Sequence, residues 1–263
     1  MRTLVALNCA IALIAFTTGC QQKTAEASAS TAQAAPPPRY PDGTIRFDRA
    51  PGEKGYWDSP SVGSVFETGA KVEFDAAGKL KNLEDAQHVA PFQPWSLALF
   101  KYRQQNGLAD DPMRVCIGPG SPRQMHTPGG VRILQDRNYN RAYLIFGGGN
   151  HGWRTIFLDG RMPPNPDEVT GTFYGLAVGR IEGDTLVAES IGFNTRFWLS
   201  NSGLPHTEAM KLTERFKRGS HDVLEYEVTI DDPRTYTRPW KASWTLRWVP
   251  GDIPEQYCET GRK

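Results

Sequence analysis

The chain has 263 residues, and its 30 basic and 29 acidic side chains leave it almost without net charge. Because a nucleic-acid partner requires a strongly basic face, we expect no nucleic-acid partner. The length is enough for one substantial core or two small ones, and 26 glycines and 20 prolines indicate many turns.

The first 20 residues resemble a bacterial export signal. A basic start at Arg2 is followed by an apolar run from Leu4 to Phe16 and then by Thr17-Thr18-Gly19-Cys20. The run is shorter than the roughly 20 apolar residues that span a bilayer, and its order is that of a secretory leader. A cysteine directly after small residues resembles a lipobox. We therefore predict a lipoprotein signal peptide at 1–19 and acyl chains, such as palmitate, on Cys20; an ordinary leader and an uncleaved anchor helix are the alternatives.

The segment after Cys20 has the composition of a linker. Residues 21–39 are rich in Ala, Ser, Thr, Gln and Pro and contain no aliphatic side chain larger than Ala. Such a segment cannot bury enough apolar surface to offset its ordering entropy. We predict that 20–39 form a lipidated, flexible tether. Gln21 rather than Asp after the cysteine favours a lipid-anchored protein of the bacterial cell envelope, on the outer membrane and facing the periplasm.

Two of the four cysteines remain in the predicted mature domain. Cys9 leaves with the leader and Cys20 is acylated, so Cys116 and Cys258 are left outside the cytoplasm, where disulfides persist. We predict a disulfide bridge between them, which would close 258 − 116 = 142 residues. Two buried free thiols are the alternative.

Residues 40–130 form a turn-rich region that we expect to pack on the main domain. One helix is predicted near 94–106, because Pro94 suits a first turn and Gly107 suits a stop. Trp95, Leu99 and Tyr102 would share one face of this helix.

From Val131 onward, short β-branched and aromatic runs alternate with turn residues. The predicted strands are Val131–Arg137, Arg141–Phe146, Trp153–Asp159, Tyr174–Glu182, Asp184–Phe193, Met210–Arg218, Asp222–Asp231 and Pro239–Pro250. About eight strands with mostly short links predict an antiparallel up-and-down barrel over 131–263, because closure removes unpaired edges. A β-sandwich is the alternative.

The period-2 pattern places one carboxylate among apolar side chains. Met210, Leu212, Glu214 and Phe216 share the inward face of one predicted strand. A buried carboxylate must find a partner or hold a proton. Glu214 is therefore a candidate catalytic residue, and a structural bridge with a nearby Arg is the alternative.

Residues 110–258 resemble a widespread, uncharacterised family of bacterial exported proteins and lipoproteins. The resemblance rests on four stretches: DDPMRVCIGPGSPRQMHTP (110–128), RTIFLDGR (154–161), VGRIEGDTLVAESIGFNTRFWLSNSGLPHTEAMKLTERF (178–216) and YEVTIDDPRTYTRPW (226–240). It implies export and a β-rich barrel of the lipocalin or calycin type. Gly55-Tyr56-Trp57 is also similar to the Gly-x-Trp opening of a lipocalin barrel.

Three histidines lie in or beside predicted loops, where binding groups often occur. His126, His151 and His206 could each provide a general base or acid together with Glu214. A divalent metal bound by His206, Glu208 and a second histidine is an alternative, although the spacing matches no metal motif. We otherwise expect no cofactor.

The last two predicted strands place Tyr226, Trp240, Trp244 and Trp248 on their inward faces. These aromatic side chains favour a small-molecule binder. We expect a lipid-anchored envelope protein whose barrel cavity holds a small apolar or aromatic ligand. Ligand contacts are predicted at Arg123, Arg154, Asn194, Trp198, Tyr226 and Trp244. A cofactor-independent lyase, isomerase or hydrolase using His/Glu chemistry in the same cavity is the second hypothesis. A structural envelope module with a solidly packed barrel is the third.

Overall fold

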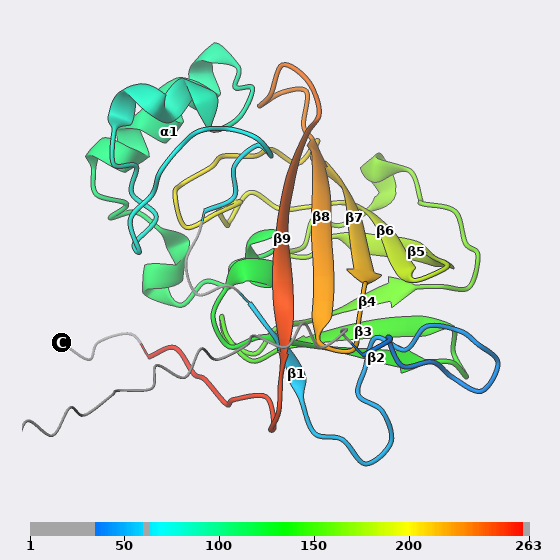
Figure 1. The fold of residues 1–263 in the computed structure, drawn as a ribbon. Coiled ribbons are helices and arrows are strands. Elements are labelled where there is room, and N and C mark those ends of the chain that lie inside the picture. The colour runs from blue at the N-terminus through cyan, green and yellow to red at the C-terminus, as the bar shows by residue number, and fades with distance from the viewer. Residues whose placement is uncertain (1–34, 60–63, 260–263) are drawn as a thin grey trace, which may run out of the picture. The chain divides into compact units, whose positions relative to one another are not determined.

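Nine strands close into a barrel in the computed structural model, which describes residues 35–59 and 64–259 (Figure 1). These described residues form one compact unit. The predicted leader, Cys20 and most of the tether lie outside the described residues. The strands are β1 (Tyr56–Asp58), β2 (Val131–Asp136), β3 (Arg141–Phe146), β4 (Trp153–Phe157), β5 (Leu176–Glu182), β6 (Thr185–Ile191), β7 (Lys211–Arg218), β8 (Val223–Asp231) and β9 (Trp240–Val249).

The predicted β-barrel is confirmed, and closure sets the sandwich alternative aside. Eight of the strands match the predicted runs within two residues at either end. Two features differ from the expected antiparallel meander. β4 and β5 pair in parallel, and β1, from the N-terminal region, pairs with both β2 and β9 to close the barrel.

Alternation along the strands sorts side chains between the core and the outside. On β7, Leu212, Glu214 and Phe216 are almost completely buried, whereas the alternate positions are exposed or half-buried. β8 follows the same pattern, with Tyr226 and Val228 buried. The side chains that point inward therefore fill the centre of the barrel.

The chain that precedes β1 covers part of one end of the barrel. Arg218, at the end of β7, is fully buried and donates to the backbone carbonyls of Arg46, Asp48 and His221. Its guanidinium lies 4.8 Å from the ring centroid of Trp57, the tryptophan of the Gly-x-Trp sequence. Burial lowers the pKa of Arg218 to about 10, so it stays charged at neutral pH. The short strand β1 is held in place by this contact.

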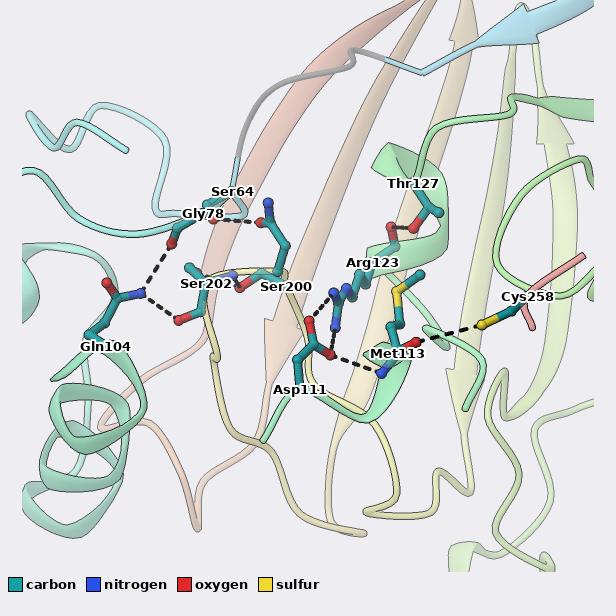
Figure 2. A network of polar contacts seen from close by, with 11 residues as sticks. Ser64, Gly78, Gln104, Asp111, Met113, Arg123, Thr127, Ser200, Ser202 and Cys258 are labelled. Carbon is teal, nitrogen blue, oxygen red and sulfur yellow. Dashed lines mark hydrogen bonds and ion pairs between the residues drawn. The ribbon is translucent and has the colours of Figure 1, made fainter. Parts of the chain in front are cut away.

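The predicted helix is present as α1 (Pro94–Gln105), with Pro94 in its first turn. Its buried side chains are Ser96, Phe100 and Gln104, whereas Trp95 and Tyr102 are exposed, so the expected apolar face was wrong. The amide of Gln104 donates to the carbonyls of Gly78 and Ser202 (Figure 2). The polar contacts of Gln104 and the packing of Phe100 on Phe92 together hold α1 in place.

Four short 3₁₀ helices complete the described elements: η1 (Leu83–His88), η2 (Pro112–Val115), η3 (Arg123–His126) and η4 (Pro166–Glu168). No helix in 35–59 or 64–259 has the length and hydrophobicity needed to cross a bilayer.

The Cys116–Cys258 disulfide is confirmed. The two Cα atoms lie 5.5 Å apart, within the usual range for a bridge. It connects the chain just after η2 to the C-terminal segment, and Cys258 lies beside Met113 of η2 (Figure 2).

The last residues of the predicted tether are described and contact the barrel. The backbone N–H of His221 donates to the carbonyl of Ala35, and Arg39 forms an ion pair with Asp184. Any tether therefore reaches the barrel at residues 35–39.

Candidate functional site

Glu214 pairs with an arginine at the centre of the barrel. Its two carboxylate oxygens accept hydrogen bonds from the two terminal nitrogens of Arg154, at 3.0 and 2.7 Å. The hydroxyl of Tyr226 donates to the same carboxylate at 2.7 Å, and Ser121 and Ser190 accept from Arg154. We call these five residues the central network.

The central network keeps its charges by pairing them. Burial alone lowers the pKa of Arg154, but the charge of Glu214 and its hydrogen bonds outweigh burial and raise that pKa. Burial, followed by the nearby Glu214 carboxylate, raises the pKa of Tyr226 well above its ordinary value, so Tyr226 remains a donor. Within the central network, only Nε of Arg154 lacks a hydrogen-bond partner. The bidentate pair matches the structural bridge weighed for Glu214.

Five of the predicted site residues lie close to one another. Arg154, Glu214 and Tyr226 belong to the central network, and the ring of Trp244 lies 4.6 Å from that of Tyr226. His126 meets Trp244 edge-on at 5.5 Å. Burial, followed by the charge of Arg123, lowers the pKa of His126 to about 3, so its imidazole is neutral.

The helix η3, which carries His126, fills the barrel end where β3 finishes. All four of its residues are buried. The carbonyl of Met125 accepts from the Trp244 indole, and Gln124 donates to the carbonyl of Gly148 and accepts from the hydroxyl of Tyr174. This end of the barrel is therefore occupied by the protein's own side chains.

The other two histidines lie apart from Glu214. Nε2 of His206 bonds with the carbonyl of Phe197, and Nε2 of His151 accepts from the backbone N–H of Gln256. In the part of the chain that the structure describes, no hydrogen bond joins a histidine to Glu214, and no group of three His, Cys, Asp or Glu side chains is arranged to hold a metal. The acid–base pair that the sequence suggested is not assembled.

The remaining predicted ligand contacts make bonds within the protein. Arg123 forms a buried ion pair with Asp111, whose oxygens accept at 2.8 and 2.6 Å (Figure 2). Asn194 accepts from the backbone N–H of Arg196, and Trp198 lies under the guanidinium of Arg103 at 4.4 Å. These contacts shape the fold around the barrel.

A hollow of about 700 Å³ opens at the opposite barrel end from η3. β4 and β5 pair over only two positions, Ile156 with Ala177 and Phe157 with Val178. β5 then continues through Glu182 with β6 on its other side, while the chain leaves β4. The hollow is lined by Thr44, by most of the β2–β3 turn from Gln135 to Arg141, and by Leu158, Arg180 and Ile181. We call it the barrel-end hollow.

Three arginines line this hollow, and two of them are paired. Arg137 forms an ion pair with Asp42, and Arg180 forms ion pairs with Glu182 and Glu189. Arg141 has no carboxylate within ion-pair distance among the described residues. Its Nε is buried and lacks an acceptor, and its guanidinium lies 5.1 Å from the ring of Phe157.

A second hollow, of about 500 Å³, lies on the outer face of β7, β8 and β9. It differs from the barrel-end hollow in the pairing of its cations. Its cations are all engaged: Arg215 pairs with Glu182, and Lys217 pairs with Glu225. Surface pairs of this kind contribute little energy, but they leave no free cation for a ligand. The barrel-end hollow alone of these two presents an unpaired charge.

Sequence reasoning missed the barrel-end hollow because its residues come from four separate segments. The sequence predicts only a short link at 138–140 between two strands. A signal was nevertheless present, since Arg137 directly follows β2, Arg141 begins β3 and Arg180 lies two residues before the end of β5.

The comparisons identify no relative: the chain matches no protein-family model, no curated protein and no solved structure. The resemblance to exported bacterial proteins therefore stays a prediction, and the function must be argued from the geometry.

Proposed function

We propose that this chain is a lipid-anchored envelope protein that binds a small molecule in the barrel-end hollow. The observation that carries the proposal is the interrupted barrel wall beside Ile181, which leaves about 700 Å³ open next to an unpaired guanidinium. A volume of this size is typical of small-molecule sites.

The location of the proposed site differs from the expected cavity. The barrel centre is filled by the central network and the aliphatic side chains around it, all almost fully buried. The hollow needs no rearrangement to admit a ligand. Its lining offers Leu158 and Ile181 to an apolar part and polar side chains to the rest, so the proposed ligand is amphiphilic rather than wholly apolar.

Blocking the hollow tests the binding proposal. We expect Ile181→Trp to abolish binding of small amphiphiles to a leaderless chain that begins at Cys20→Ser, because the indole would occupy the opening. The matched control is Thr245→Trp, which places the same ring in the outer hollow of β7, β8 and β9. Ligand-observed NMR measures both, and thermal unfolding checks that both variants fold. Equal binding by the two variants would overturn the proposed site.

Lipid attachment is tested separately. Protein expressed from the full chain in a bacterium and extracted from membranes should have the mass of residues 20–263 plus acyl chains. Cys20→Ala should remove the added mass and release the protein from the membrane fraction. A wild-type protein without the added mass of acyl chains would contradict the lipid anchor. That result would leave the proposed binding site in the hollow untouched.

A purely structural role is the second candidate, and the packed barrel centre favours it. It becomes the better account if no small molecule binds the wild-type chain at millimolar concentration. The enzyme hypothesis receives less support, because the Glu214 carboxylate already accepts three hydrogen bonds.

A further inference from the structure

We infer that the ligand of the barrel-end hollow carries an anionic group, and that Arg141 binds it. This inference rests on the proposed function and names the class of ligand: a small organic acid with an apolar part. A guanidinium can donate two parallel hydrogen bonds to one carboxylate, so an unpaired arginine in a hollow suits this class.

Arg141 is held in place without being neutralised. It begins β3, where its backbone pairs with Asp136 across the β2–β3 turn and with Phe157 of β4. The Phe157 ring supports one face of the guanidinium. Nε is buried and has no hydrogen-bond acceptor among the described residues, so the charge of the guanidinium is left unmatched within the fold.

The neighbouring charges leave room for an anion. Asp136 is the carboxylate in the lining, and it accepts from the backbone N–H groups of Asn138 and Tyr139, so it is engaged within its own turn. Arg137 and Arg180 also line the hollow, but their charges are matched by Asp42, Glu182 and Glu189. Arg141 is therefore the cation of the lining that is left for a negative ligand group.

The apolar part of the ligand has a separate place. Leu158 directly follows β4 and Ile181 belongs to β5, and both side chains are only half-buried. A ligand that covers them removes apolar surface from water while its acid group stays with Arg141. An inorganic anion would contact Arg141 but would leave Leu158 and Ile181 uncovered.

The test compares two probes of the same shape that differ in charge. Phenylacetate and phenylacetamide are titrated by NMR into the leaderless Cys20→Ser chain and into its Arg141→Gln variant. We expect phenylacetate to bind the unaltered arginine roughly tenfold to a hundredfold more tightly than the amide does. Arg141→Gln should remove that difference and leave the affinity for phenylacetamide unchanged.

The control variant is Arg161→Gln. The guanidinium of Arg161 also lies over the Phe157 ring, at 3.9 Å, but it does not line the hollow. It should keep the preference for phenylacetate. Equal affinity for the two probes in the wild type, or loss of the preference in Arg161→Gln, would overturn the role of Arg141 while leaving the binding proposal intact.

Two further outcomes separate this inference from the proposed function. If neither probe binds the wild type at up to tens of millimolar, the binding proposal fails and the inference fails with it. If inorganic phosphate binds as tightly as phenylacetate and competes with it, the apolar part plays no role and the assigned ligand class is wrong.

Discussion

Two arginines on neighbouring strands show opposite ways of placing a charge in this barrel. Arg154 on β4 points into the centre and is matched by Glu214, Ser121 and Ser190. Arg141 on β3 lies at the rim beside the barrel-end hollow and has no carboxylate partner among the described residues. The charge of Arg154 is paired within the fold, whereas the charge of Arg141 is available to a ligand.

Burial of a polar side chain does not by itself indicate a binding or catalytic site. A buried charge costs several kcal/mol unless it is paired, so most buried charges in proteins have partners and serve structure. An unpaired guanidinium beside open volume is the more informative observation.

Breaking the central pair should give the largest loss of stability. Glu214→Gln leaves Arg154 charged and unmatched in the core, and we expect a loss of about 3–5 kcal/mol in the free energy of unfolding. Urea denaturation measures it. The double variant Arg154→Met with Glu214→Leu should regain most of the loss, because it leaves no buried charge. A single variant as stable as the wild type would show that the network is dispensable.

Removing the disulfide should cost less or a similar amount. The Cys116→Ser and Cys258→Ser double variant frees a closure of 142 residues, and we expect it to lose about 2–5 kcal/mol. Denaturation with and without a reductant measures the loss in the wild type. Identical unfolding midpoints in the two conditions would contradict the expectation.

A smaller change in stability should come from the titration of His221, at the barrel end where Arg218 lies. His221 faces Asp222 at 2.6 Å and Glu53 at 3.0 Å, with Arg218 bonded to its carbonyl and Trp248 beside its ring. A neutral imidazole has one N–H, so both carboxylates are satisfied only by the imidazolium. Hydrogen bonds to Asp222, and then to Glu53, raise the pKa of His221.

The direction of the pH dependence of stability follows from the raised pKa of His221. Because the folded-state pKa lies above the unfolded value, the stabilisation is fully present below about pH 6.5 and is lost as the pH rises through the folded pKa. Solvent exposure of His221 limits it to below about 1 kcal/mol. Melting temperatures of wild type and His221→Gln should differ more at pH 5.5 than at pH 8.5. A difference that grows toward high pH would have the wrong sign.

The smallest change in stability is expected at Arg141. Arg141→Gln should alter the free energy of unfolding by no more than about 0.5 kcal/mol, because no ion pair is lost. The same urea experiment used for Glu214→Gln measures it. A loss of unfolding free energy comparable to that of Glu214→Gln would show that Arg141 stabilises the fold. The contrast between Arg141 and Arg154 would then no longer hold.

Much of the fold could be predicted from local sequence. Strands such as β3 and β7 show inward–outward alternation that follows directly from the period of an extended chain. β1 was missed because its three residues are too few for a pattern, and their place depends on contact with Arg218. The parallel pairing of β4 with β5 was missed because the intervening chain does not reveal strand direction.

The candidate site was harder to predict. The pattern identified Glu214 as a buried carboxylate, and a bridge to a nearby arginine was one of the two interpretations, but the pattern did not identify Arg154 as that arginine. The hollow depends on where a pairing stops, which is a property of register between strands. No single stretch of sequence around Arg141 or Ile181 contains that information.

The central claim is that recognition takes place at the barrel-end hollow and not at the barrel centre. Amide chemical-shift mapping of the leaderless Cys20→Ser chain during titration with phenylacetate tests it most directly. We predict that the perturbed amides cluster between Gln135 and Arg141 and at Leu158, Arg180 and Ile181. Shifts confined to Ser121, Arg154, Glu214 and Tyr226 would contradict this account.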